Sequence, residues 1–409
     1  MKATTLRPFF PAVFVLLFAL QLIGCIAGVP AALEGRTDFR SFYMAGYAIR
    51  TGHGAELYDY EFQKRLQNEL TSQYDVALMF NHPACEALLF VPLSFFSFRT
   101  AYFVYGALNA LLLALTIWMV RGRLSHLSEL WRPLPIAIFL CFFPIGIALK
   151  LGQDSILLLF LYSASFIALS QGKDFRAGVF LGLALVKFQI AIPVAFLFLL
   201  WRRWRFVAGF AAAGTILLAV SIEVVGLAGV SAYLRPLLAV GGGLGTAAER
   251  LTYGVYPRLM PNLRGLVDGL TDNILGVRAA HLVTAVISLL VIVWAAMRRR
   301  SFPLALTAAL VVSYHLNPHD LSLLALPIAL VLDGAFAQKA SLTRRDLTAV
   351  SLAALFLFTP VYVWLWRPEL VYLLAVPLAA LLFVSPGVLP EDMPSLPATA
   401  SSDYGSVDQ

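Results

Sequence analysis

Apolar runs with few charges recur along most of this 409-residue chain, and they restrict it to folds that lipid can solvate. Of its residues, 60% are hydrophobic and 13% are charged, against about 45–50% and about 25% in soluble domains. Too few polar side chains remain to cover a soluble surface. The chain is therefore predicted to be an all-α integral membrane protein, a polytopic bundle of about twelve transmembrane helices in a single domain, 1–387. The runs lie near 8–29, 100–120, 134–149, 155–171, 177–187, 189–200, 206–227, 278–297, 303–316, 320–334, 347–366 and 370–387.

Several runs are shorter than the roughly 20 residues that a helix needs to cross a bilayer. The clearest case is the pair 177–187 and 189–200, two half-length runs that meet around Lys187. Short helices survive in lipid only where protein or a wet cavity covers their ends. In the first run, Gly178 and Gly182 favour close packing against another helix. The stretch 85–98 is interpreted as a re-entrant or interfacial helix.

Positive charge in the short loops predicts the direction of the runs. If sixteen of the thirty Lys and Arg residues are cytoplasmic, the runs alternate without contradiction. The loops 30–84 and 228–277 then face outward from the cell inner membrane, and the tail 388–409 is a disordered cytoplasmic end. The net charge of +7 is explained by loop placement and contact with membrane lipids, so no nucleic-acid partner is expected. The sixteen are Lys2, Arg7, Arg121, Arg123, Arg132, Lys173, Arg176, Arg202, Arg203, Arg205, Arg298, Arg299, Arg300, Lys339, Arg344 and Arg345.

Cysteine and histidine spacing does not indicate a metal site. The three cysteines form no CxxC pair, and two of them lie inside apolar segments. His53, His82 and His126 do not show the spacing of metal ligands. No metal ligands are therefore predicted.

Polar and charged motifs stand at the outward ends of the runs. An acid just beyond a membrane helix is often only a solvated anchor, but ionisable residues at membrane depth are functional candidates by default. The topology brings one carboxylate, several cations and two histidines to one membrane face, which predicts a polar site there. The motifs occupy 37–43, 57–59, 81–83, 150–154, 187–189, 261–266 and 314–320.

In order and spacing, these motifs resemble those of the polyprenyl-phosphate-sugar-dependent glycosyltransferases of the membrane C-type superfold, in particular glycosyltransferase family 87. The resemblance implies a C-type glycosyltransferase-like bundle whose outward loop bears short amphipathic helices, one of them at 60–70. The matching pieces are Asp38…Tyr43…Gly46, Leu57-Tyr58-Asp59, Asn81-His82-Pro83, Gly152-Gln153, Ala177-Gly178 through Lys187 to Trp201-Arg202-Arg203-Trp204, Pro261-Asn262-Leu263-Arg264-Gly265-Leu266 and Asn317-Pro318-His319-Asp320-Leu321.

The resemblance also implies a reaction. A hexosyltransferase of this kind moves a sugar, with mannose as the guess, from a polyprenyl-phosphate-linked donor to a lipid or glycan acceptor on the outer face of the membrane. The transfer is an inverting single displacement, and Asp38 matches the catalytic acid of the family by position, so it is the predicted general base. Because Asp38-Phe39-Arg40 lacks a clear Asp-x-Asp, no cofactor is predicted, and a divalent metal is left open.

Cations suit a departing lipid phosphate, because negative charge builds on it as the glycosidic bond breaks. Arg264 and Lys187 are the leading predicted phosphate ligands, with Lys150 behind them. A lysine between two half-helices is equally well explained as a snorkelling side chain. His319 is predicted to hold the acceptor or the phosphate, with helix capping as the alternative. The predicted binding set also includes Gln153, Tyr43 and Asp320.

The competing class is a transporter or flippase for a lipid-linked or small polar substrate, which broken helices and intramembrane charge also fit. A transporter would favour repeat symmetry between its halves and charges at the membrane midplane. This sequence shows no repeat of fixed period, and its ionisable groups gather at one face. The pattern therefore favours the transferase.

Overall fold

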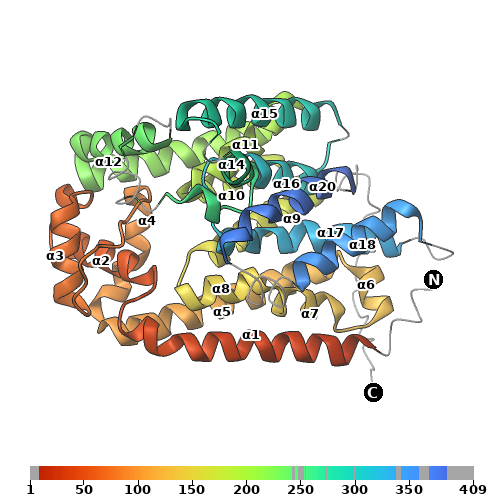
Figure 1. Cartoon of the computed structure of the whole chain (residues 1–409), viewed down its shortest axis with the longest axis horizontal. Helices are drawn as coiled ribbons and strands as arrows, with labels where there is room; N and C mark the ends of the chain where they lie inside the picture. The colour runs from red at the N-terminus through yellow and green to blue at the C-terminus, as the bar shows by residue number, and fades with distance from the viewer. Residues whose placement is uncertain are drawn as a thin grey trace, which may run out of the picture.

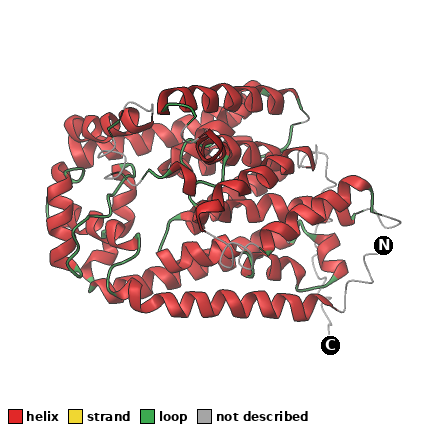
Figure 2. Ribbon diagram, in the orientation of Figure 1, coloured by secondary structure: helices red, strands yellow, loops and turns green. Residues whose placement is uncertain are grey.

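Helices and their connections make up the described part of the chain, and no strand occurs in it (Figure 2). The computed structural model describes residues 9–241, 245–246, 253, 255–271, 274–298, 300–337, 342–358 and 368–384. The all-α prediction is confirmed for these residues. The predicted cytoplasmic tail, 388–409, lies outside them.

Among the described residues, six helices are long and apolar enough to cross a membrane. The pair α7 (Leu134–Leu140) and α8 (Phe143–Leu151), bent by 47°, gives up to seven. The polytopic membrane class is confirmed, while the count of about twelve crossings stays a prediction. The six are α1 (Phe10–Leu33), α5 (Phe98–Arg121), Asp174–Leu200, Trp204–Leu238, α15 (Val277–Met297) and Pro318–Phe336; shorter apolar helices are α9 (Ser155–Ser170), α16 (Phe302–Val312) and Glu369–Val384.

The other elements are short helices and 3₁₀ turns, together with the separate helices that make up the longer segments named above. They are α2 (Phe39–Arg50), α3 (Tyr60–Leu70), α4 (Ala84–Ala87), α6 (Ser125–Leu130), α10 (Asp174–Leu183), α11 (Phe188–Leu200), α12 (Trp204–Gly241), α14 (Leu263–Thr271), α17 (Ala325–Phe336), α18 (Arg344–Leu357) and α20 (Ala375–Val384), with η2 (Gly54–Glu56), η3 (Leu88–Phe90), η4 (Pro92–Phe95), η5 (Ala184–Lys187), η6 (Pro257–Leu259), η7 (Pro318–Leu324) and η8 (Pro368–Leu374).

One face of α15 shows why lipid must surround this bundle. Leu282, Leu289 and Leu290 on this helix are exposed by 60% or more of their surface. A run of large apolar side chains left open in this way is rare on soluble proteins. In a bilayer the same face contacts hydrocarbon at no cost.

The half-length runs around Lys187 form a hairpin. A straight helix over Asp174–Leu200 would be about 40 Å long, yet Arg203 Nη2 lies 2.6 Å from Asp174 Oδ1 in an ion pair that joins the two ends. The chain must therefore turn back at η5, so Asp174–Leu200 is not one straight helix despite its length, and Lys187 lies at the tip. The predicted close packing is confirmed, because a Cβ atom at Gly178 would overlap the carbonyl of Phe206 on α12.

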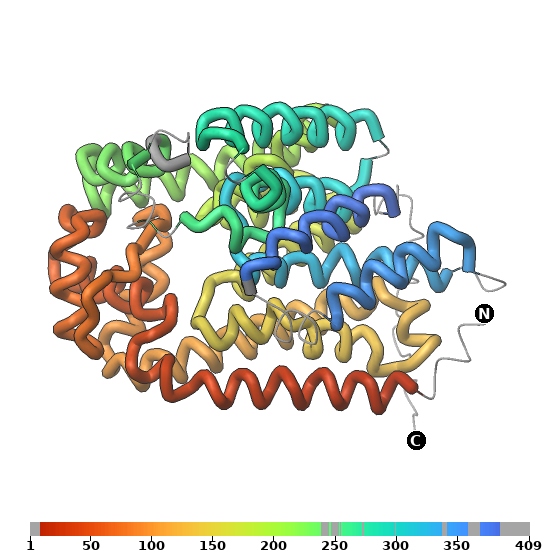
Figure 3. Tube along the Cα trace, viewed as in Figure 1, coloured from red at the N-terminus to blue at the C-terminus, as the bar shows by residue number. Residues whose placement is uncertain are grey.

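Short helices gather at one end of the bundle, here called the site end, where α2, α3 and α4 lie (Figure 1, left; traced as a tube in Figure 3). The predicted amphipathic segment 60–70 is helix α3. Residues 85–98 lie mostly in α4, η3 and η4, each of four residues or fewer, too short to cross a bilayer. Stacked rings, such as Phe42 on Phe90 at 4.8 Å, hold these pieces together.

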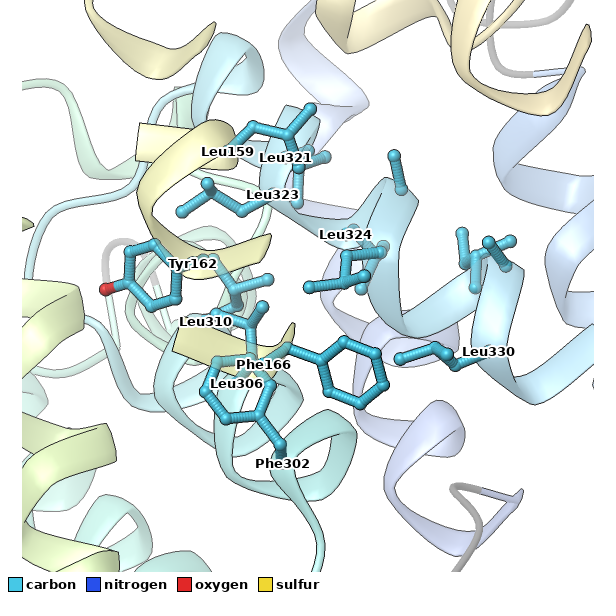
Figure 4. Close-up of a cluster of buried hydrophobic side chains, with 14 of the residues drawn as sticks. Leu159, Tyr162, Phe166, Phe302, Leu306, Leu310, Leu321, Leu323, Leu324 and Leu330 are labelled. Atoms are coloured by element: carbon cyan, nitrogen blue, oxygen red, sulfur yellow. The ribbon is translucent and has the colours of Figure 1, made fainter. Parts of the chain in front are cut away.

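The largest apolar core of the described residues draws on helices such as α9 and α16, and it supports η7. Phe166 of α9 packs on Phe302 of α16 with ring centroids 5.9 Å apart, and the leucines of η7 fill the space beside them (Figure 4). Leu321, Leu323 and Leu324 are at most 1% exposed. Because interiors of this kind are close-packed, the polar residues of η7 are held in place by its apolar ones.

Candidate active site

A chamber of about 260 Å³ lies at the site end, bounded by α2, residues 76–82, the α8–α9 junction, the hairpin tip and η7. Its lining is rich in polar side chains, unlike the lipid-facing surface. Half a dozen chain segments far apart in sequence converge on it. The polar lining residues include Asp38, Asn81, His82, Gln153, Lys187, Gln189, His315, Asn317, His319 and Asp320.

Asp38 stands at the start of α2 as a partly exposed residue in a buried stretch. Gln153 Nε2 donates a hydrogen bond of 2.6 Å to Asp38 Oδ2. Gln153 can reach α2 because α8 ends in Gly152 at a left-handed φ of 65°, a conformation that glycine adopts without strain. A Cβ atom there would lie 2.7 Å from Phe39 Cβ. The turn therefore brings the amide to the carboxylate.

Lys187 lies in a buried network. Its Nζ atom is 2.6 Å from Asp154 Oδ1 and 2.6 Å from Asp320 Oδ1. It also donates to Ser155 Oγ at 3.3 Å and to Gln153 Oε1 at 3.4 Å. The lysine side chain is 5% exposed and both carboxylates are 1% exposed. A buried cation is stable only with such close partners, so the side chain stays in the network and does not extend to bulk solvent.

The start of η7 presents His319 and Asp320 to the chamber. Asp320 Oδ2 accepts a 2.9 Å hydrogen bond from the backbone N–H of Asn317, as part of a capping box. His319 Nε2 lies 3.5 Å from Asp320 Oδ1. Asp320 thus caps the turn, pairs with Lys187 and lies next to His319.

Two predicted site residues, Tyr43 and Lys150, do not line the chamber in the part of the chain that the structure describes. Tyr43 donates its hydroxyl to the carbonyl of Phe96 at 2.8 Å, so it joins α2 to the η4 segment. Lys150 borders a separate, largely apolar groove of about 280 Å³. Its side chain lies against Gly28 of α1.

Arg264 also lies outside the chamber lining. Its Nη1 atom donates to the carbonyl of Tyr314 at 2.8 Å, and Nη2 lies 3.0 Å from His281 Nε2. The guanidinium carbon is 4.8 Å from the centroid of the Tyr314 ring. Burial lowers the pKa of Arg264 from its usual value, but an arginine still stays charged at neutral pH. Arg264 thus braces the segment that leads to His315 on the chamber wall.

Comparison with known families agrees with this geometry. The profile of glycosyltransferase family 87 matches residues 80–327, which are 248 of the 409 residues. The chain belongs to glycosyltransferase family 87. Neither a curated protein nor a solved structure gives a significant match. The matched region contains Gln153, Lys187 and Asp320, whereas Asp38 precedes it.

In this family 87 glycosyltransferase, the chamber brings together five of the eight predicted site residues. A carboxylate with a polar donor beside it can accept a proton, and a buried cation can stabilise an anion that forms next to it. The chamber therefore provides the groups that a glycosyl transfer needs. The five residues are Asp38, Gln153, Lys187, His319 and Asp320.

Sequence reasoning missed the roles of His82, Glu86 and Asp154. His82 lines the chamber, and its Nδ1 atom lies 2.8 Å from Glu86 Oε2. A partial signal was present, because His82 and Glu86 are only four residues apart in the sequence, although His82 itself precedes α4. Asp154 lies next to Gln153 in the predicted motif 150–154 but is absent from the predicted site residues.

Replacement of Arg264 by lysine distinguishes a phosphate ligand from a brace. If the guanidinium holds Tyr314, Arg264→Lys loses one buried hydrogen bond and the ring contact, and we expect a loss of about 1–3 kcal/mol in stability. The apparent donor affinity should then change little. If Arg264 binds the donor phosphate, as the sequence predicts, the apparent KM for the donor rises while the melting temperature stays constant. Melting curves and donor kinetics on one preparation measure both.

Proposed function

We propose that this glycosyltransferase moves a hexose, mannose being the first to test, from a polyprenyl-phosphate-linked donor to a lipid or glycan acceptor. The reaction takes place on the outer face of the inner membrane. The alternation of basic loops supports this orientation. Family membership supports the transferase over the transporter or flippase.

The observation that carries the proposal is the double engagement of Gln153. Its Nε2 atom donates to Asp38, and its Oε1 atom accepts from Lys187. One amide therefore links a carboxylate and a cation on the chamber wall. An inverting displacement needs this combination, a base for the acceptor and a positive charge for the leaving phosphate.

The proposed transfer is a single displacement that needs no group beyond Asp38, Lys187 and His319. Asp38 takes the proton from the acceptor hydroxyl as its oxygen bonds to the anomeric carbon of the sugar. The bond from that carbon to the donor phosphate breaks, and its electron pair leaves with the lipid phosphate. Lys187 stabilises the charge that develops there, and His319 contacts the acceptor or the phosphate.

Apolar pockets next to the chamber support a lipid-linked substrate. One, of about 80 Å³, shares Asn81, Gln189 and His315 with the chamber and continues to Phe188 and Tyr233. A second, of about 200 Å³, also borders Phe188 and Tyr233 and follows α12. Such surfaces bury hydrocarbon favourably. A lipid chain can therefore lie along α12 while its phosphate stands in the chamber.

A transfer assay tests the proposal. Purified protein in right-side-out vesicles receives polyprenyl-phosphate sugars labelled in the sugar, together with envelope lipid extract. We expect a labelled product and an equal amount of free polyprenyl phosphate. Nucleotide sugars in place of the lipid donor should give no product. Labelled donor that crosses the vesicle membrane unchanged would instead favour the flippase, and a panel of donors without product would contradict the proposal.

A further inference from the structure

His82, Glu86 and Asp154 form a compact group behind the chamber wall, here called the His–Glu–Asp cluster. His82 Nδ1 lies 2.8 Å from Glu86 Oε2 and 4.0 Å from Asp154 Oδ2. One ligand atom from each of the three residues lies within 4.8 Å of the other two. Asp154 comes from the turn before α9, so the cluster forms only when that turn meets the segment 82–86.

Two of the four carboxylate oxygens in this cluster lack the partners that buried oxygens normally have. The side chain of Glu86 is fully buried; its Oε2 atom faces His82 Nδ1 at 2.8 Å, but Oε1 accepts no hydrogen bond from the described residues. Asp154 Oδ1 has Lys187 as its ion-pair partner at 2.6 Å, whereas Asp154 Oδ2 accepts no hydrogen bond from the described residues. Buried polar atoms nearly always have a partner. Such a set of orphaned ligand atoms therefore points to a bound ion.

The charges of the region lead to the same conclusion. Glu86, Asp154 and Asp320 are three buried carboxylates, and Lys187 is shared between the last two. Even with a protonated His82, the group keeps one uncompensated negative charge, which is costly in a buried site. With a neutral His82 and a divalent cation, the charges of the group sum to zero.

Ligand spacing and type narrow the choice of ion. Neighbouring ligands in an octahedral shell of about 2.1 Å radius lie about 3 Å apart, and opposite ones about 4.2 Å apart. The separations of 2.8 Å and 4.0 Å lie close to these values, and the third separation is at most 4.8 Å. One imidazole and two carboxylates suit Mn²⁺ better than the all-oxygen ions Mg²⁺ and Ca²⁺.

We propose that His82, Glu86 and Asp154 bind one divalent transition-metal ion of the Mn²⁺ type. Asp154 then offers one oxygen to the ion and the other to Lys187, an outer-shell contact that orients a metal ligand. Spacing in the sequence pairs only His82 with Glu86, because Asp154 is 68 residues beyond Glu86. The ion also reduces the negative charge that a lipid phosphate meets in the chamber, an effect that rests on the proposed function.

Metal titration of the purified full-length protein tests the site without any activity assay. After treatment with a chelator and return of Mn²⁺, electron paramagnetic resonance and elemental analysis should find one bound ion per chain. Glu86→Gln and His82→Asn should each weaken Mn²⁺ binding at least about 10-fold. His126→Asn is the matched control, because His126 lies 2.9 Å from Asp333 and the two form no three-ligand group with any other described residue. The Mn²⁺ content of this variant should equal that of the wild type.

The outcomes separate the site from the proposed reaction. Wild-type protein without stoichiometric metal at saturating Mn²⁺ overturns the site and favours a proton shared by His82 and Glu86. Binding that both cluster variants retain overturns it as well. If a variant does not fold, the wild-type protein still tests the site. Specific binding must raise the melting temperature of the wild type as the Mn²⁺ concentration increases. Sugar transfer by metal-free protein leaves the proposed function intact, whereas bound metal without transfer leaves the site intact.

Discussion

Asp38→Asn should lower turnover by at least about 10²-fold, and by as much as about 10⁴-fold, because a positioned base contributes that much to a proton transfer. Asparagine keeps the size of the side chain and an oxygen for the 2.6 Å hydrogen bond from Gln153, but it cannot take a proton. Donor binding and the melting temperature should change little, since Asp38 is partly exposed. Product formation, donor affinity and melting curves measured together make the test.

Asp59→Asn is the matched control for this prediction. Asp59 caps α3 by accepting a 2.7 Å hydrogen bond from the backbone N–H of Phe62, and asparagine caps equally well. Its turnover should equal that of the wild type. Asp154 and Asp320 are poorer candidates for the base, because Lys187 lies against both. An Asp38→Asn enzyme that keeps more than about a tenth of wild-type turnover would contradict the assignment.

Lys187→Met should remove both activity and much of the stability. Without the ammonium group, Asp154 and Asp320 face each other as buried, unpaired carboxylates, and breaking a buried pair in this way costs about 3–5 kcal/mol. The melting temperature of the variant in detergent should therefore be clearly lower than that of the wild type. Lys173→Met is the control, because Lys173 is exposed and bonds only to Gln171 at 2.9 Å among the described partners.

Two further variants separate the structural role of Lys187 from its role with the substrate. Lys187→Met with Asp320→Asn removes one of the two stranded charges and should recover part of the stability but no transfer. Lys187→Arg keeps the charge in a larger group, so it should fold and transfer sugar slowly. A Lys187→Met protein that melts with the wild type would show that the ion network contributes little.

The polytopic membrane class and the family follow from local features of the sequence. An apolar run must form a helix in lipid, because its backbone has no other hydrogen-bond partners there. The break around Lys187 is also visible in the sequence as two half-length runs, but the ion pair between Asp174 and Arg203 is what shows that they form a hairpin. The order of the motifs along the chain suffices to recognise the family, because that order can be read without knowing which residues are in contact.

Only the tertiary structure decided which polar residues meet. Gln153 joins Asp38 across 115 residues of sequence, and Lys187 joins Asp320 across 133. Lys150 and Arg264 carry the same charge as Lys187 and share its predicted face, yet they lie outside the chamber. Hydrophobic periodicity places a residue on a helix and at a membrane depth, but contact between two helices depends on how they pack. That packing also brought Asp154 to His82 and Glu86, and only the spacing between the last two could be read from the sequence.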